Sequence, residues 1–338
     1  MKTISTYITV LNVIKGGYPF KECIKSIIPI SDEIIVVDGG STDATKDVVM
    51  SLQRKFRKIK LIEHKWDHNI PMMDGIQKAF ARSCCTGDYC FQIDADEVLR
   101  GGDAVYERIR AITEKDIDIL LTLNPTFFGG INIIRADFPQ IKPRLTKNHW
   151  DLTHGIPLQY RKITKEGNSY CDILKSDGCD MIDRNTLKWY TYKTYSVDIS
   201  REFLDLHNKL MKDRDIETGK KWVKALEQDC NTMGRAVVFH YSWINIANKL
   251  RLGDRFWTYT WRKLYGQEIK DATVGKEKDI SEEARAKSVL ATARTALRDF
   301  GNLIYGIKLK YPKLVESWLK DKSTFKSLED MVEKTKEI

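Results

Sequence analysis

The sequence lacks the features that mark several large classes of protein. Its 338 residues contain no apolar run near the roughly 18 residues that a bilayer-crossing helix needs, so no membrane span is expected. Residues Met1–Tyr7 lead directly into a strand pattern and do not resemble a signal peptide. No pair of the seven cysteines has the spacing of a zinc site, which favours reduced thiols in a cytoplasmic protein.

Two common phosphate-binding signatures are also missing, the Gly-Lys-Ser/Thr loop and the Gly-x-Gly-x-x-Gly turn. What the chain does have is the composition of an ordinary globular protein, with 42% hydrophobic and 30% charged residues. Its length suits one large domain or two modest ones. The net charge of +9 favours anionic partners, among them nucleotide phosphates, phospholipid, anionic saccharide and nucleic acid.

The first hundred residues alternate strand and helix patterns. Segments rich in β-branched and apolar residues predict strands over 4–11, 33–38, 60–63 and 89–93. Apolar residues at helical spacing predict helices over 20–28, from about 41 onward, and over about 72–84. This order predicts an α/β fold with an open, mostly parallel sheet that binds ligands at the carboxyl ends of its strands.

The rest of the chain changes character twice. Between about 118 and 200 the pattern is irregular and rich in strands. From about 198 onward it is mainly helical, with helices expected over 199–230, 243–264, 282–304 and 312–336. Without an internal repeat or a low-complexity linker, the second half is expected to pack on the first.

Two carboxylates stand together where the strand over 89–93 ends, in the triplet Asp94-Ala95-Asp96, and Glu97 follows them. Like charges this close destabilise a fold unless something cancels their repulsion. A divalent cation does so, and oxygen ligands suit Mg²⁺ or Mn²⁺ better than Zn²⁺. The alternative is that these side chains cap a helix and face water.

A second carboxylate, Asp38, ends the strand over 33–38 and precedes Gly39-Gly40-Ser41-Thr42-Asp43. Glycines allow a close approach of the backbone to a ligand, and the start of the next helix favours anions. Asp38 is then placed to bind ribose or base groups of a nucleotide. The alternative is a plain turn between strand and helix, with Ser41, Thr42 or Asp43 as the cap.

These segments together resemble family 2 nucleotide-sugar glycosyltransferases, which have the GT-A fold. The resemblance covers roughly the first hundred residues and is carried by four stretches in the right order: Thr9–Asn12, Asp32–Thr45, Trp66-Asp67 and Gly87–Glu97. The Asp-Ala-Asp-Glu block is most similar to enzymes that build bacterial surface polysaccharide or lipopolysaccharide cores. The resemblance implies a nucleotide-sugar-binding half over 1–120, an acceptor-side half over 121–242 and a helical extension over 243–338.

The resemblance also implies roles on the donor side. Thr9, Leu11 and Asn12 would flank the nucleobase, Asp38 would contact the nucleoside, and Asp67 would belong to the same substrate-binding set. Asp94 would lie near the ribose or the metal.

The metal itself, Mn²⁺ or Mg²⁺, would bridge the diphosphate and be bound by Asp96. His240, in Val237-Val238-Phe239-His240-Tyr241, follows a strand-like run, and in similar enzymes a histidine here completes the metal shell or touches the diphosphate. The alternative for His240 is a partly buried structural histidine.

The acceptor side is harder to assign. Many relatives have a Gly-x-x-His-Glu segment where this chain has Thr153-His154-Gly155, so the glutamate after the histidine is missing. An inverting transfer needs a base within reach of the acceptor hydroxyl. Asp151, His154, Asp177 and Asp180 are all eligible, and the last two also fit a surface turn.

The sequence therefore predicts a metal-dependent transferase that moves a sugar from a nucleotide diphosphate-sugar to a glycan or lipid-linked acceptor hydroxyl, with inversion. It is expected in the cytoplasm, and its basic charge permits peripheral contact with an anionic membrane at the inner face. Three rivals stay open: glycosylation of a modified base in DNA, a nucleotidyltransferase on a similar sheet, and a non-catalytic sugar- or nucleic-acid-binding protein. The oligomeric state is not predicted.

Overall fold

The computed structural model describes residues 1–66, 73–135, 141–154, 181–183, 195–197, 199–213, 216–244, 303–305 and 307–320. The predicted site residues Asp67, Asp177 and Asp180 lie outside these ranges. So do nearly all of the helix expected over 243–264, most of that over 282–304, and residues 321–336 of that over 312–336.

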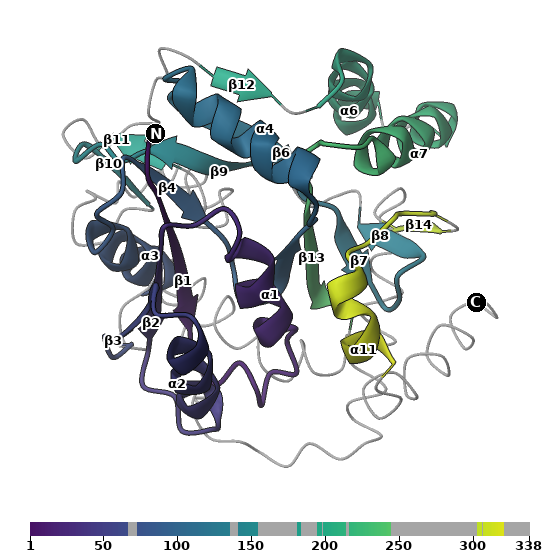
Figure 1. Ribbon diagram of the computed structural model, residues 1–338. Coiled ribbons are helices and arrows are strands. Elements are labelled where there is room, and N and C mark those ends of the chain that lie inside the picture. Colours follow the sequence, from purple (N-terminus) through teal and green to yellow (C-terminus); the bar gives the residue numbers. More distant parts are fainter. Residues whose placement is uncertain are drawn as a thin grey trace, which may run out of the picture.

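A seven-stranded sheet forms the centre of the molecule (Figure 1). Its strands, in spatial order, are β12 (Tyr195–Val197), β6 (Ile119–Leu123), β9 (Ile141–Lys147), β4 (Tyr89–Gln92), β1 (Ile4–Val10), β2 (Glu33–Asp38) and β3 (Ile59–Glu63). Neighbouring strands are parallel except where β9 pairs with β4 and with β6. The middle strands β1 and β2 are buried almost throughout, as expected for continuous apolar runs in a parallel sheet.

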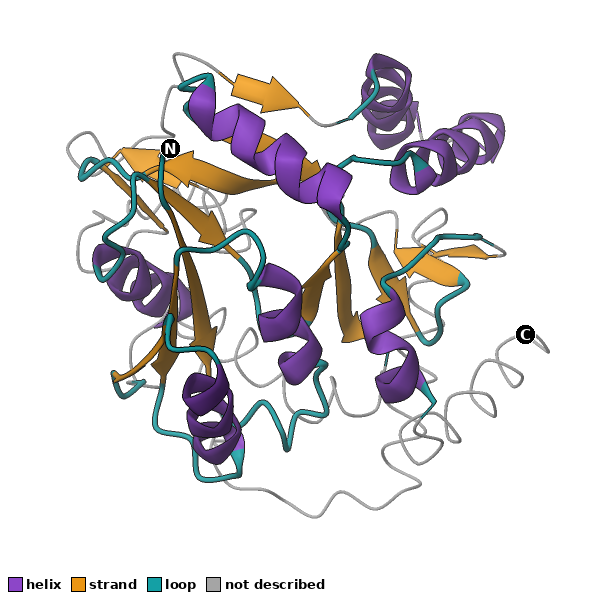
Figure 2. Ribbon diagram, in the orientation of Figure 1, coloured by secondary structure: helices purple, strands orange, loops and turns teal. Residues whose placement is uncertain are grey.

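Helices cover both faces of this sheet (Figure 2). One face packs with α1 (Phe20–Ile27), α2 (Thr45–Lys55) and α4 (Asp103–Glu114) around an apolar core that includes Ile8 and Val36. The other face packs on α3 (Met73–Ser83) through alternate residues of the same strands, such as Tyr7 and Val37. Successive side chains of a strand point to opposite faces, so each middle strand contributes to both cores.

A second sheet adjoins the first and has its own core. Its strands, in order, are β14 (Leu303–Tyr305), β8 (Ile133–Arg135), β7 (Thr126–Phe128), β13 (Val238–Trp243) and β5 (Glu97–Leu99). The associated helical elements are α6 (Arg201–Asp213), α7 (Ile216–Asn231), η2 (Lys313–Val315) and α11 (Glu316–Leu319), and a separate hairpin pairs β10 (Leu152–His154) with β11 (Met181–Asp183).

The predicted α/β class is confirmed, and the first four strands and three helices lie within a few residues of their expected bounds. The strand-rich stretch over 118–200 is also present in the described residues. The prediction of the C-terminal helices is less accurate. The segment over 199–230 contains two helices, and 303–305 forms strand β14, because it pairs with β8 at the edge of the second sheet. Tertiary pairing here overrides the local helical pattern.

The strand order 3-2-1-4 at the centre of the first sheet fixes where a ligand binds. The chain proceeds from β1 through β2 to β3 on one side of β1, and then places β4 on its other side. The connections leave β1 and β4 in opposite directions, which opens a crevice at their carboxyl ends. Residues after Val10, Val37 and Gln92 border that edge. Among the described residues, no helix is long and apolar enough to span a bilayer.

Candidate functional site

Asp38 ends β2 with its side chain fully buried. Its Oδ2 accepts hydrogen bonds from the backbone N–H groups of Gly40 at 3.0 Å and Ser41 at 2.9 Å, and Lys46 Nζ lies 3.8 Å away. Its Oδ1 is buried without a hydrogen-bond partner among the described residues. A buried acceptor of this kind is costly, and it is the feature that a ribose hydroxyl or a base N–H would satisfy.

The loop after β1 is fastened to the loop after β2. Asn12 has a positive φ of 50°, and its Oδ1 accepts hydrogen bonds from the N–H groups of Thr42 at 2.7 Å and Asp43 at 3.2 Å. In return, Ser41 Oγ accepts the Asn12 N–H at 2.9 Å. The predicted base-flanking residue Asn12 therefore uses its side chain to hold the neighbouring loop. Thr9 and Leu11 lie beside it, half-buried.

Gly39 is needed for a close approach at this edge. An added Cβ would lie 2.1 Å from Cδ1 of Trp66, whose ring covers the glycine. The backbone N–H of Trp66 donates to the Gly39 carbonyl at 2.9 Å. Gly40, the next residue, has a backbone φ of +98°, which residues with a side chain rarely adopt. The two glycines thus form the tight turn that the sequence predicted, with Trp66 closing over it.

Replacing Gly39 by Ala is expected to destabilise the protein by about 1–3 kcal/mol, because the added methyl group must displace the Trp66 ring. Chemical denaturation followed by tryptophan fluorescence measures the change. Gly130→Ala is the matched control, since nothing lies within 4 Å of the methyl group it adds. A Gly39→Ala protein as stable as this control would contradict the packing described.

Asp94 follows β4 and is held by a buried cation. Its Oδ1 contacts Lys78 Nζ at 2.9 Å and accepts a hydrogen bond from Gln92 Nε2 at 2.9 Å. Burial on its own raises the pKa of the Asp94 carboxyl, but the nearby cations, Lys78 foremost, hold that pKa well below its usual range. The carboxylate is therefore charged and already compensated.

Glu97 is the third carboxylate of the motif and is fully buried. Its Oε1 pairs with the guanidinium of Arg144, which is also fully buried, accepts a hydrogen bond from Asn124 Nδ2 at 3.1 Å, and has Lys142 Nζ at 3.8 Å. Two of the three carboxylates, Asp94 and Glu97, are thus paired with buried cations, and the third, Asp96, faces His240.

Asp96 and His240 meet across two strands that are far apart in sequence. His240 lies within β13, where it is the register partner of Glu97 on β5, and its Nε2 is 3.5 Å from Asp96 Oδ2. The other ring nitrogen, Nδ1, lies 3.0 Å from Thr126 Oγ1. Tyr241 N–H donates to the Asp96 carbonyl at 2.8 Å, which fixes the two strands against each other. The sequence grouped this aspartate and histidine, and the structure brings them together.

The donor set of Asp96 and His240 fits a divalent ion that is shared with a ligand. A carboxylate oxygen and an imidazole nitrogen at this separation can bind one ion, and Mg²⁺ or Mn²⁺ commonly takes one or two protein ligands and completes its shell with phosphate oxygens. Among the described residues, no group of three or more His, Cys, Asp or Glu side chains could hold a metal alone. Asp94, the third predicted ligand, is paired with Lys78.

The acceptor-side candidates fall in different environments. Asp151 lies half-buried in the turn before β10. His154, in β10, is fully buried, and its Nε2 contacts the hydroxyl of Tyr7 on β1. Burial raises the pKa of that Tyr7 hydroxyl above its usual value. This packing speaks against His154 as a base for an incoming hydroxyl, which must be reachable from solvent.

The sequence reasoning missed the buried cations Lys78, Lys142 and Arg144. One signal was present for Lys78. Lys78 lies on the buried face of α3, together with Ala81 and Arg82, which follow it by three and four residues. Apolar residues are expected on such a face, so a lysine there is unusual. The two cations of β9 carried no such signal, because strand pairing between β9 and β4 is what brings them under the motif.

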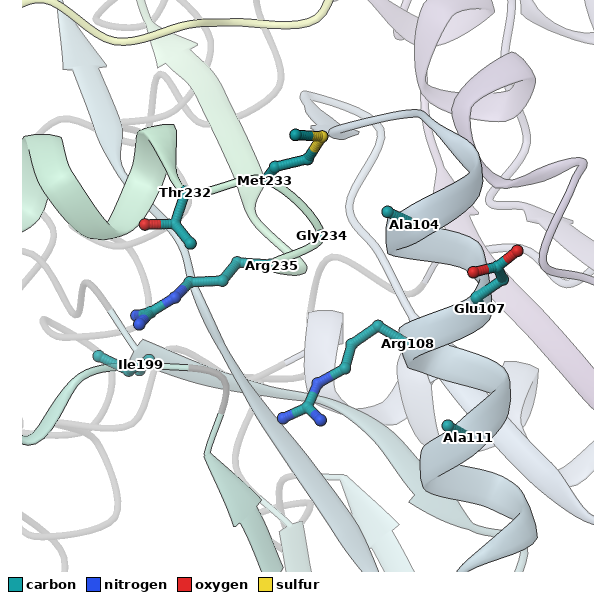
Figure 3. A pocket seen from close by; sticks show the side chains of 9 residues that line it. All are labelled: Ala104, Glu107, Arg108, Ala111, Ile199, Thr232, Met233, Gly234 and Arg235. Atoms are coloured by element: carbon teal, nitrogen blue, oxygen red, sulfur yellow. The ribbon is translucent and has the colours of Figure 1, made fainter.

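The pocket in Figure 3 lies elsewhere in the molecule. It has a volume of about 600 Å³ and lies between α4 and the connection from α7 to β13. Its lining residues are Ala104, Glu107, Arg108, Ala111, Ile199, Thr232, Met233, Gly234 and Arg235. None of the predicted site residues is among them.

Comparison with known proteins gives a family for the part of the chain that carries this edge. Residues 8–166 match the family described as Glycosyl transferase family 2. An uncharacterised glycosyltransferase of Rickettsia typhi is 37% identical over 99 residues, which are 29% of this chain and 30% of the relative. The lipopolysaccharide core biosynthesis glycosyltransferase LpsC of Rhizobium meliloti is 36% identical over 96 residues, or 28% of this chain and 32% of LpsC.

The chain thus matches about a third of the length of each of these relatives. Among solved structures, TarS of S. aureus aligns with 97% of this chain and 55% of its own, with 14% identity and a TM-score of 0.38. The family match confirms the resemblance seen in the sequence.

Proposed function

Because residues 8–166 belong to glycosyl transferase family 2, we propose that this protein transfers a sugar from a nucleotide diphosphate-sugar to an acceptor hydroxyl with the help of a divalent metal ion. The observation that carries the proposal is the Asp96–His240 pair beside the carboxyl ends of β1 and β4. An open α/β sheet binds nucleotides at that switch point. A diphosphate bound at this switch point would lie beside Asp96 and His240, whose side chains suit a divalent metal ion.

On the donor side, Asp38 binds the nucleoside. Its Oδ1, which has no partner among the described residues, supplies an acceptor beside the tight turn of Gly39 and Gly40. Asn12 shapes the same edge from the neighbouring loop, with Thr9 and Leu11 close to the base. Asp67 lies outside the described residues and keeps the substrate-binding role that the resemblance gives it.

Asp96 and His240 are the residues that would hold Mn²⁺ or Mg²⁺ beside the diphosphate. When bound, the ion supplies Lewis-acid stabilisation of the negative charge that develops on the departing diphosphate. Asp96 and His240 keep their positions through the backbone bond from Tyr241 and the Thr126 contact. Asp94, predicted to lie near the ribose or the metal, also pairs with Lys78.

Transfer proceeds by single displacement with inversion, for which an acceptor-side base must take the hydroxyl proton. Of the candidates that the structure describes, Asp151 is half-buried and His154 is fully buried, which favours Asp151. Asp177 lies outside the described residues and stays a candidate. A glycan acceptor is supported by the relative LpsC, which is named for lipopolysaccharide core biosynthesis. The net charge of +9 suits an anionic acceptor or contact with an anionic membrane surface from the cytoplasm.

A thermal-shift panel of nucleotide diphosphate-sugars, with and without Mn²⁺, tests the proposal. A ligand at about 100 times its Kd stabilises the folded protein by about 2.7 kcal/mol, and we expect Tm to rise by about 5 °C or more with the correct donor and Mn²⁺ together. Slow donor hydrolysis by the same sample would then show turnover. A rise with nucleoside triphosphates alone would favour a nucleotidyltransferase, and no rise with any donor would overturn the proposal.

A further inference from the structure

We propose that Glu97 and Arg144 are positioning residues, and that their buried ion pair sets the geometry of Asp96 and His240 for the metal-bound diphosphate. This inference rests on the proposed function. Neither side chain is exposed, so neither can touch a donor or an acceptor directly. Their effect must pass through the residues that they hold.

Glu97 closes the Asp94–Asp96 turn through two hydrogen bonds to Asp94. Its Oε2 accepts the Asp94 N–H at 2.9 Å, and its own N–H donates to the Asp94 carbonyl at 3.0 Å. The turn is therefore closed by both the main chain and the side chain of one residue. A carboxylate accepts a backbone N–H more strongly than an amide does, because the bond is charge-assisted.

Arg144 joins this turn to the end of β4. One guanidinium nitrogen, Nη2, contacts Glu97 Oε1, and the other, Nη1, contacts Gln92 Oε1. Gln92 in turn donates from Nε2 to Asp94 Oδ1 at 2.9 Å. A guanidinium binds two acceptors in a fixed planar arrangement, which the single ammonium group of lysine cannot reproduce. The chain of contacts thus fixes both ends of the motif.

The same cluster reaches the strand of His240. Asn124 Nδ2 donates to Glu97 Oε1 at 3.1 Å and to the Val238 carbonyl of β13 at 2.8 Å, and Glu97 is the register partner of His240. The Glu97 carboxylate therefore binds groups from the turn after β4, from β9 and from the β6–β7 connection, and Asn124 links it to β13. These elements belong to two sheets, and the Asp96–His240 pair lies where the sheets meet.

The variants Arg144→Lys and Glu97→Gln test this inference in the full-length protein. The measurement is the Mn²⁺ affinity of the UDP complex, from the electron paramagnetic resonance signal of free Mn²⁺, with KM and kcat measured alongside. Loss of a residue that orients a metal ligand typically weakens metal binding about 10- to 100-fold, and we expect that range for both variants. Arg144→Lys retains the charge and decides the question alone should Glu97→Gln not fold.

Asp229→Asn is the matched control, because Asp229 forms a largely buried ion pair with Arg235 at 2.7 Å beside the pocket of Figure 3. It should lower Tm without changing Mn²⁺ affinity. Wild-type Mn²⁺ affinity in Arg144→Lys, with only a loss of Tm like that of the control, would overturn this inference and leave the proposed function standing. A wild-type protein that binds Mn²⁺ with no nucleoside diphosphate of the donor panel would overturn the proposed function and this inference with it.

Discussion

Replacing Asp96 by Asn is expected to lower the rate of sugar transfer about 1,000-fold while leaving the fold intact. The carboxylate faces His240, and in the proposed function its loss would remove most of the metal's stabilisation of the leaving diphosphate. That stabilisation amounts to several kcal/mol, and about 4 kcal/mol corresponds to about three powers of ten in rate. Kinetics with saturating donor and Mn²⁺ measure the loss.

The matched control for this variant is Asp205→Asn, which removes an exposed carboxylate on α6. It should retain wild-type activity. The free energy of unfolding of Asp96→Asn should stay within about 1 kcal/mol of wild type, since the amide keeps the size of the side chain. An Asp96→Asn protein with more than a tenth of the wild-type rate would remove Asp96 from the metal site.

Replacing Asp94 by Asn is expected to act on stability instead, and to cost about 3 kcal/mol at neutral pH. The variant removes the carboxylate that lies 2.9 Å from the buried Lys78 ammonium, and breaking a buried pair costs several kcal/mol. Urea denaturation measures the change. Glu217→Gln is the control, because Lys220 and Glu217 form a similar pair at 2.7 Å in which both side chains are exposed. Such a pair contributes less than about 1 kcal/mol.

The pH dependence of this second effect has a definite sign. The pKa of Asp94 is lower in the folded chain than in the unfolded chain, where it is about 3.9. Its carboxylate therefore stabilises the fold fully above that value, and the contribution is lost as the pH falls through the lower folded-state pKa. The stability difference between wild type and Asp94→Asn should be constant near neutrality and shrink below about pH 4. A difference that grows on acidification would contradict the Lys78 pairing.

The two aspartates of one triplet thus have different partners, and the local sequence pattern could not separate them. Asp94 and Asp96 are two residues apart, so any local pattern treats them alike. They differ because α3 places Lys78 beside the first and β13 places His240 beside the second. Both partners come from distant parts of the chain. Only the resemblance to a family pointed to His240, and nothing in the sequence reasoning pointed to Lys78.

Elements with a strong local signal were predicted closely. The strand over 33–38 is a continuous apolar run and has the bounds expected of it. The predicted helix start near Ser41 was less accurate, because the Ser41 and Asp43 side chains accept the N–H groups of Asn12 and Lys15 in the facing loop. Helix α2 begins only at Thr45, without a side-chain cap. Here contacts between loops, which have no periodicity, decided the local structure.

Asn12 also has a consequence for motion at this edge. The loops after β1 and β2 share hydrogen bonds in both directions, so neither can detach without breaking bonds of the other. In the language of local unfolding they form one cooperative unit, whose opening free energy includes the contacts of both loops. A ligand that secures either loop therefore rigidifies the pair, and an insertion in one loop alters the opening equilibrium of both.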